Sequence, residues 1–308
     1  MGFAVEISKD DIAFTSKFPW KLGIVYNMAY PSLQSSEEDL EKAAAFLTQD
    51  GFFDRIEIHK ISDEGWRKIK KYFQNLDIVR AFQLEVIAQG NNINAHDEQK
   101  RKNAVNYIKG QIDLAVKRGI RKFAICSGQI TQDVERDKRQ LVASLKEISA
   151  HAMKYGATFV LETFDIDKDK KLVMGPIDQS AKLLKEVRKT CDNIFLLWDH
   201  GHAPLLGETP EVLMEHFEVL GAIHIGCGIK VQDGLKDWHP VYHTVGAINE
   251  EKDLAHLFQV LSEIKYRGPV TVEIKPQQGQ IPEEVINSAK GAIYSSYVLF
   301  LKDYLKIC

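Results

Sequence analysis

The sequence predicts a single-domain α/β protein with the closed (β/α)8 architecture of a TIM barrel. Three observations support this prediction. The chain has 308 residues, and such a barrel usually needs about 250. Short apolar stretches alternate with amphipathic ones along the chain, as expected when parallel strands alternate with helices. No low-complexity linker divides the sequence, so one domain over residues 1–308 is expected.

Each expected strand is a short apolar run bounded by polar residues, glycine or proline. The clearest is 194–198, where five successive apolar residues indicate a parallel strand buried on both faces. Side chains alternate along a strand, so Asp199 should share a face with Leu197 and point into the barrel mouth. In chain order, the strands are expected at 22–28, 54–61, 78–87, 122–128, 158–164, 194–198, 221–226 and 270–274.

The expected helices show apolar residues at helical spacing. In the first, Leu40, Ala44 and Leu47 fall on one face, and Asp50-Gly51 ends the helix. In chain order, the helices are expected at about 37–49, 63–76, 98–118, 135–155, 176–189, 211–219, 253–265 and 282–306. The last is a long closing helix, and residues 1–20 are expected to form a short lead-in to the barrel.

An open, doubly wound sheet is the alternative fold, because it also alternates strands with helices. Such a sheet would have a Gly-rich turn after its first strand. The corresponding residues, 26–30, read Tyr-Asn-Met-Ala-Tyr. The closed barrel is therefore the favoured architecture.

Composition and charge disfavour several classes of function. Charged residues make up 27% and apolar residues 44% of the chain, as in globular proteins. The net charge of −3 and the lack of a dense Lys/Arg cluster argue against nucleic acid as a partner. No run approaches the roughly 18 apolar residues of a membrane helix, and residues 1–11 do not resemble a signal peptide. Four cysteines without C-x-x-C spacing suit a reducing compartment, so a cytoplasmic location is expected.

Four consecutive late strands each end in a side chain that can bind a metal ion. The four residues are Glu162, Asp199, His224 and Glu273. Strand alternation places them on the inner side, and the carboxyl ends of barrel strands meet at one mouth, so we expect one shared divalent ion. Without an ion, three converging carboxylates would repel one another. Three carboxylates and one imidazole favour Mn²⁺, with Mg²⁺, Co²⁺ and Zn²⁺ as alternatives.

Such a site indicates proton transfer beside a carbonyl group. A metal ion that binds a carbonyl oxygen and the neighbouring hydroxyl acidifies the C–H bond between them, and a nearby carboxylate can take that proton. If two carboxylates flank the carbon on opposite faces, the carbon centre is inverted. If one carboxylate returns the proton to the adjacent carbon, an aldose and a ketose interconvert. Both outcomes remain open at this point.

Three further residues are expected to contact the substrate. Glu57 faces the same way as the metal site, and the alternative for it is an ion pair with Arg55. Lys275 also faces the mouth, where it would either bind a sugar carboxylate or offset the charge of the carboxylates. The long polar segment 229–249 is expected to form a lid, and Trp238 within it is suited to stacking on a sugar face.

A resemblance to a known family lies in the strand ends, which read Leu161-Glu162, Trp198-Asp199-His200-Gly201-His202, Ile223-His224-Ile225 and Val272-Glu273. They resemble the xylose-isomerase-like barrel superfamily, also called the sugar phosphate isomerase/epimerase family, closely in the second half of the chain and in architecture in the first. In its ketose 3-epimerase branch, both metal-bound glutamates also exchange the substrate proton, which implies these roles for Glu162 and Glu273. The resemblance also implies sugar contacts for His202 and for Lys230, where that branch usually has Arg.

The resemblance implies a metal-dependent isomerase or epimerase that acts on a ketose, an aldose or a sugar acid. A lyase that dehydrates a keto-inositol or similar polyol is the main alternative, because it begins with the same proton abstraction. The apurinic endonuclease branch has an Asp-x-His that matches Asp237 and His239, but the histidines that it uses at earlier strands are not found at the end of 122–128. A barrel that binds a sugar without catalysis is a further alternative, but it would not need all four of the expected metal-binding residues.

The expected partner is a small sugar or sugar derivative, with neither nucleic acid nor membrane. The loop 277–282 lacks the Gly-rich helix entry of a barrel phosphate site, which favours an unphosphorylated substrate. Tyr294, Tyr297 and Phe300 of the closing helix would serve internal packing or the interface of a homo-oligomer.

Overall fold

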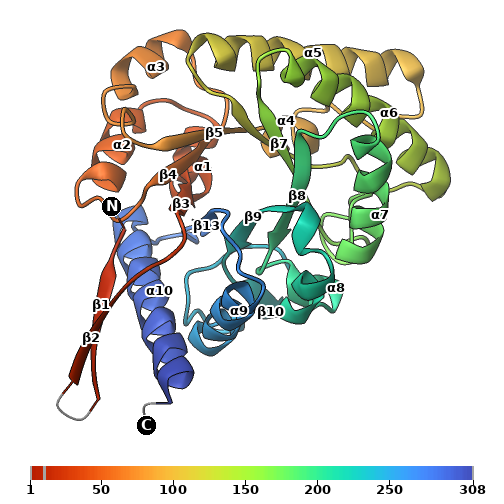
Figure 1. The fold of residues 1–308 in the computed structure, drawn as a ribbon. Helices are drawn as coiled ribbons and strands as arrows, with labels where there is room; N and C mark the ends of the chain where they lie inside the picture. Colours follow the sequence, from red (N-terminus) through yellow and green to blue (C-terminus); the bar gives the residue numbers. More distant parts are fainter. Residues whose placement is uncertain (1, 10–11, 307–308) are drawn as a thin grey trace.

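The computed structural model describes residues 2–9 and 12–306, and in it eight parallel strands close into a barrel (Figure 1). The strands are β3 Leu22–Val25, β4 Arg55–Ile58, β5 Asp77–Ala81, β6 Lys122–Ile125, β7 Thr158–Glu162, β8 Ile194–Asp199, β9 Leu220–Ile225 and β13 Val270–Val272. The barrel closes at β13, where Thr271 pairs with His224 of β9 on one side and with Gly23 of β3 on the other. The predicted (β/α)8 fold is confirmed.

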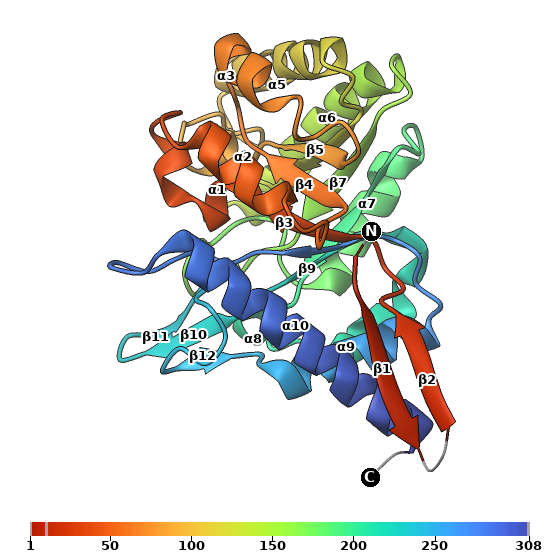
Figure 2. The same cartoon turned by 90° about the vertical axis from the view of Figure 1, so that its left-hand side faces the viewer.

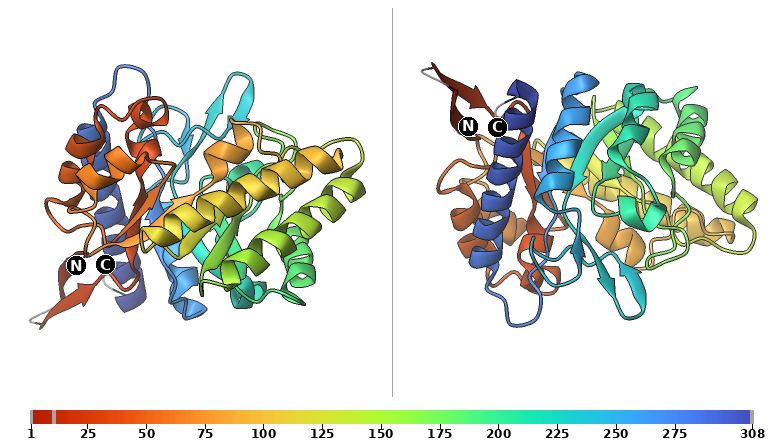
Figure 3. Two further views of the ribbon diagram at one scale, coloured as in Figure 1. Left: turned by 90° about the horizontal axis from the view of Figure 1, so that it is seen from above. Right: turned by 90° about the horizontal axis from the view of Figure 1, so that it is seen from below.

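Helices connect the strands and cover the outside of the barrel (Figures 1 and 3). The longer ones are α2 Leu40–Thr48, α3 Asp63–Ile69, α5 Glu98–Lys117, α6 Val134–Met153, α7 Ile177–Arg188, α9 Glu251–Glu263 and α10 Pro282–Leu305. Ser62, Asp97 and Asp133 begin three of them, because each side chain accepts a hydrogen bond from a backbone N–H of the first turn. In the part of the chain that the structure describes, no helix is long and apolar enough to span a bilayer.

The structure corrects the sequence prediction in two connecting segments. The expected strand 78–87 ends at Ala81, and the short helix α4 Gln83–Ile87 follows it. This turn lets the buried carboxylate of Glu85 reach back to Arg80 and form an ion pair. The expected α-helix at 211–219 is replaced by two 3-10 turns, Pro210–Glu215 and Phe217–Val219.

Two further segments contain strands that the sequence did not reveal. The lead-in forms an antiparallel hairpin of β1 Ala4–Lys9 and β2 Ile12–Lys17, which lies alongside α10 (Figure 2). The expected lid forms a small sheet of β10 Gly228–Val231, β11 Gly234–Lys236 and β12 Ala247–Ile248. The short helices α1 Tyr26–Ala29 and α8 Ala203–Leu206 follow β3 and β8 directly.

The inside of the barrel has an apolar part and a polar part. The apolar part is built from small or branched side chains: Val79, Ala81, Ala124, Val160, Leu197 and Ala222. The polar part centres on Arg55, whose Nε lies 3.2 Å from Glu57 Oε1 and whose Nη1 donates to Asp77 Oδ2 at 3.0 Å. Gly23 makes room for it, because a Cβ there would lie 3.1 Å from Arg55 Cβ and 2.8 Å from Thr271 Oγ1.

Arg55 compensates buried negative charge below the barrel mouth. Glu57 is completely buried. Burial opposes ionisation of this carboxyl, but the charges of His224 and Arg55 outweigh burial and lower its pKa to about 2. Removal of the guanidinium would deprive a buried carboxylate of one of its two compensating charges, which is a costly change.

We therefore expect Arg55→Met to lower the free energy of unfolding by about 3–5 kcal/mol, as measured by urea denaturation. Lys122 is the matched control, because it also pairs with Asp77 but is half-exposed. Lys122→Met should cost less than about 1 kcal/mol. Equal losses for the two variants would contradict the role given to Arg55.

Candidate metal centre and active site

Four side chains from adjacent strands meet at the carboxyl end of the barrel. They are Glu162 at the end of β7, Asp199 at the end of β8, His224 in β9 and Glu273 directly after β13. One ligand atom from each lies within 4.8 Å of the others. His224 Nδ1 lies 2.8 Å from Glu273 Oε2 and 3.4 Å from Glu162 Oε1. The structure thus brings together the four residues that the sequence predicts as metal ligands.

The chemistry of this first cluster (Glu162, Asp199, His224 and Glu273) fits a divalent cation. Glu162 Oε1 and Asp199 Oδ2 are buried oxygens that form no hydrogen bond. Burial raises the pKa of Glu162, and the charge of Glu273 adds to this effect against the opposing influence of His224. Burial disfavours the charged form of His224, but the surrounding carboxylates outweigh it and raise its pKa well above the ordinary value. A cation would supply the positive charge that this oxygen-rich set needs.

Neighbouring side chains hold the cluster in position. His224 Nε2 lies 3.2 Å from Glu57 Oε2, so the ring turns its Nδ1 atom towards the carboxylates. Thr271 Oγ1 donates to the other oxygen of Glu57 at 2.9 Å. Gln83 Nε2 donates to Glu162 Oε2 at 2.7 Å, which leaves Oε1 facing the cluster. Such outer hydrogen bonds orient metal ligands and adjust their basicity.

Gln83 was not recognised from the sequence, which placed it inside a strand. Its position at the N-terminus of α4, directly after β5, puts its side chain at the barrel mouth. A polar residue just after a barrel strand is the signal that would have identified it.

A cavity of about 500 Å³ opens beside the first cluster. Glu162, His224 and Glu273 form part of its wall. The remaining wall combines polar and charged side chains with an apolar part, which includes Val25, Met28, Ala81, Leu84, Ile87, Ala88 and Phe164. The volume falls within the range of about 300–1,000 Å³ that is typical of small-molecule sites.

The predicted substrate contacts divide into two groups. Glu57, Lys275 and Trp238 line the cavity. His202 and Lys230 do not line it: His202 is buried with its Nδ1 atom 2.9 Å from the Thr163 carbonyl, and Lys230 is exposed on β10. Both groups of contacts remain predictions, but the first lies where a ligand in the cavity would be.

Two lysines bring positive charge to the cavity. Lys275 is partly exposed, and the structure records no ion pair for it among residues 2–9 and 12–306. Lys170 was not singled out in the sequence. It lies in a loop that Asp165 orders by accepting hydrogen bonds from the N–H groups of Lys168, Asp169 and Lys170 itself, at 2.6 to 2.7 Å.

Comparisons with known proteins extend this description. The family model described as xylose isomerase-like TIM barrel matches residues 43–291. A comparison with curated proteins finds no match.

Solved structures with the same fold cover nearly the whole chain. The structure of L-ribulose 3-epimerase has a TM-score of 0.73 at 19% identity and covers 93% of this chain and 98% of its own. D-psicose 3-epimerase with D-tagatose from Clostridium cellulolyticum H10 has a TM-score of 0.70 at 18% identity, covering 91% and 99%. The IolI protein with a binding zinc atom has a TM-score of 0.69 at 22% identity, covering 92% and 99%. At these identities the likeness shows a shared fold.

The strand ends, the closed barrel and the match over residues 43–291 all lead to the same assignment. The chain belongs to the family of xylose isomerase-like TIM barrels.

Proposed function

We propose that this protein is a divalent-metal-dependent sugar isomerase or epimerase. The observation that carries the proposal is the first cluster, because it joins a fitting set of metal ligands to the wall of a cavity suited to a small molecule. Sugar 3-epimerases among the structures with the same fold give further support. The proposed substrate is a ketose, an aldose or a sugar acid.

Glu162, Asp199, His224 and Glu273 would hold the ion. We propose Mn²⁺, with Mg²⁺, Co²⁺ and Zn²⁺ as alternatives. Zn²⁺ gains support from IolI, whose structure contains a zinc atom. A divalent cation at this position would stabilise the negative charge that develops on a carbonyl oxygen when the neighbouring carbon loses a proton.

The chain itself would supply the groups that move the proton. Glu162 and Glu273 come from separate strands and both reach the cavity. The Gln83 amide holds one oxygen of Glu162 and leaves the other free of hydrogen bonds. Burial raises the pKa of Glu162, which makes its carboxylate a better base than an exposed glutamate. If one glutamate removes a proton and the other returns one, the carbon is inverted; transfer by a single glutamate to the next carbon gives isomerisation.

Other cavity residues would position the sugar. The exposed ring of Trp238 is suited to stacking on a sugar face. Glu57 is completely buried and pairs with Arg55, Thr271 and His224, so it would position the ligand His224 instead of contacting the sugar. Lys275 would bind a carboxylate substituent of a sugar acid. The loop after β13 has no Gly-rich entry to α10, which favours an unphosphorylated substrate.

The first prediction concerns the proton-transferring glutamates. Glu162→Gln and Glu273→Gln should each slow exchange of the substrate C–H hydrogen with deuterated water by about 10²–10⁴-fold, because an amide cannot act as the base. The measurement is deuterium incorporation by NMR over a panel of ketoses, aldoses and inososes. Metal content must be determined in parallel, and Glu211→Gln, an exposed carboxylate outside the cavity, is the control. Full turnover of Glu273→Gln with its metal retained would remove the proton role of Glu273.

The second prediction concerns the ion. Removal of bound metal with a chelator should abolish C–H exchange, and added Mn²⁺ should restore it. The cation would offset the repulsion among the buried carboxylates and stabilise the negative charge that develops on the substrate oxygen. The product mass distinguishes the main alternative, since a dehydratase would release a product lighter by one water. Unchanged exchange in protein verified to be metal-free would contradict metal dependence.

The third prediction concerns the substrate class. Lys275→Gln should raise the KM for a sugar acid by about 10- to 100-fold, because a hydrogen bond to a charged group is lost. The KM for a neutral ketose should stay the same. Lys252→Gln, outside this cavity, is the control. If Lys275→Gln leaves both KM values unchanged, Lys275 only offsets the charge of the carboxylates.

A further inference from the structure

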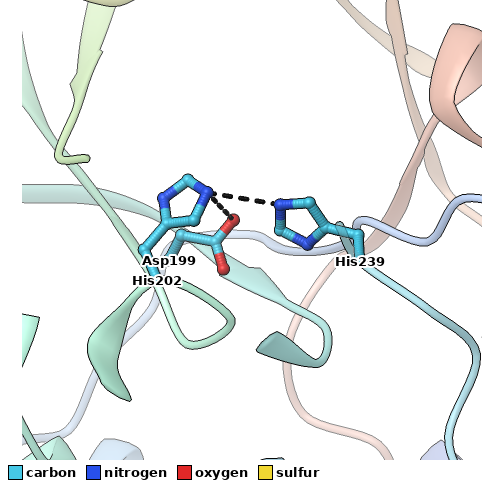
Figure 4. Close-up of side chains that lie close together, drawn as sticks. All are labelled: Asp199, His202 and His239. Atoms are coloured by element: carbon cyan, nitrogen blue, oxygen red, sulfur yellow. Dashed lines mark hydrogen bonds and ion pairs between the residues drawn. The ribbon is translucent and has the colours of Figure 1, made fainter. Parts of the chain in front are cut away.

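The first cluster occupies only one half of the barrel mouth. Its residues come from β7, β8 and β9 and from the position after β13, and these strands are neighbours in the barrel. Polar side chains crowd this half, and Figure 4 shows how His202 and His239 face each other beside Asp199. The cavity continues into the other half, where β3, β4 and β5 end and where α1 and α4 follow.

This other half of the cavity carries an apolar strip, which consists of Met28, Leu84, Ile87 and Ala88. Met28 belongs to α1, Leu84 and Ile87 belong to α4, and Ala88 follows α4 directly. Spacings of three and four residues put Leu84, Ile87 and Ala88 on one face of the helix. Val86 is buried instead and belongs to the hydrophobic core. The helix therefore has a core face and a separate face towards the cavity.

Internal packing does not account for the apolar strip. Met28 and Leu84 are partly exposed, and among the residues with a described position neither is part of the hydrophobic core or packed against it. Ala88 is exposed, and only Ile87 packs against the core. Apolar side chains in a cavity wall are typical of the part of a site that a ligand covers.

The apolar strip begins beside the candidate metal ligands. Gln83, which donates its hydrogen bond to Glu162 at 2.7 Å, directly precedes Leu84. A helix rises about 1.5 Å per residue, so Ile87 and Ala88 lie roughly one turn beyond Leu84. Exposure increases in this direction, because Leu84 and Ile87 are partly exposed and Ala88 is exposed. The strip thus leads from the first cluster towards solvent.

The cavity is larger than one sugar ring needs. It measures about 500 Å³. If each non-hydrogen atom takes up no more than the roughly 30 Å³ of a liquid water molecule, a six-carbon sugar with about twelve such atoms fills at most about 360 Å³. A ligand that fills the cavity therefore extends beyond the ring.

The chemistry of the strip indicates what this extension is. Apolar side chains offer no hydrogen bond, so a hydroxyl group against them would lose its water partners without compensation. Asn27, Gln34 and His59 line the same half and can serve the hydroxyl groups of the ring itself. Carbon atoms placed against the strip would instead be stabilised by burial.

We propose that the substrate is a sugar with an apolar substituent, an alkyl or aryl group, which lies along Met28, Leu84, Ile87 and Ala88. This inference rests on the proposed function, because the sugar itself would be held at the first cluster. Burial of each methylene group of the substituent would raise the affinity by up to about fourfold.

The test uses a chain-length series that does not depend on the identity of the sugar. Straight-chain hydroxamates, from acetohydroxamate to hexanohydroxamate, can bind a divalent ion through two oxygens, as a carbonyl and its neighbouring hydroxyl would. Their affinities for the Mn²⁺-loaded full chain are measured by calorimetry. In the wild type, the affinity should rise about two- to fourfold for each added methylene.

Four variants locate this effect. Leu84→Asn and Ile87→Asn should remove most of the rise with chain length, whereas their affinity for acetohydroxamate should stay that of the wild type. Leu84→Met, which keeps an apolar side chain of similar size, should retain the rise. Met153→Asn is the matched control, because Met153 is an exposed apolar residue at the end of α6 and lies outside the cavity. It should retain the rise as well.

Two results would overturn the proposal. One is an affinity of the wild type that does not increase with chain length, and the other is an unchanged increase in both Leu84→Asn and Ile87→Asn. C–H exchange over the sugar panel is measured separately. Exchange without a chain-length effect would leave the proposed function standing, whereas a chain-length effect without exchange of any sugar would contradict the function and keep the apolar strip as a binding site.

Discussion

Burial of negative charge is the constraint on which the rest of this structure depends. Glu57, Glu162 and Asp199 are completely or almost completely inaccessible to solvent, and they lie within one barrel. Carboxylates removed from water are tolerated only with a compensating charge or hydrogen bonds. Arg55 and Thr271 provide this compensation for Glu57. At the mouth, Gln83 and His224 provide part of it, and a bound cation would provide the rest.

The barrel satisfies this constraint in layers. Small and branched side chains fill one part of the interior, Arg55 and its partners fill another, and the candidate metal ligands lie at the carboxyl ends of the strands. The layers are connected, because Glu57 contacts both Arg55 below and His224 above. Glu57 therefore links the buried ion pairs inside the barrel to the orientation of a candidate metal ligand, His224.

The connections after the strands form a large part of the cavity wall. Trp238 and Lys275 come from segments after β11 and β13, and Lys170 comes from the loop after β7. Lys170 Nζ also donates to the Asp237 carbonyl at 3.0 Å, which joins two of these segments. The same joined segments carry Asp237 and His239, which also line the cavity. In barrels of this kind, strands position the shared chemistry and loops provide its variation.

The sequence by itself determined the barrel and the first cluster. The alternation of side chains along a strand is local, so the inward direction of Glu162, Asp199, His224 and Glu273 could be predicted without knowledge of the loops. The N-terminal hairpin, the contact of Gln83 with Glu162 and the burial of His239 were decided only by the tertiary structure. The hairpin depends on packing against α10, and the place of His239 depends on a hydrogen bond from Lys275 and on space beside distant glycines. Such long-range contacts override local preferences in irregular segments, and no periodic pattern in the sequence records them.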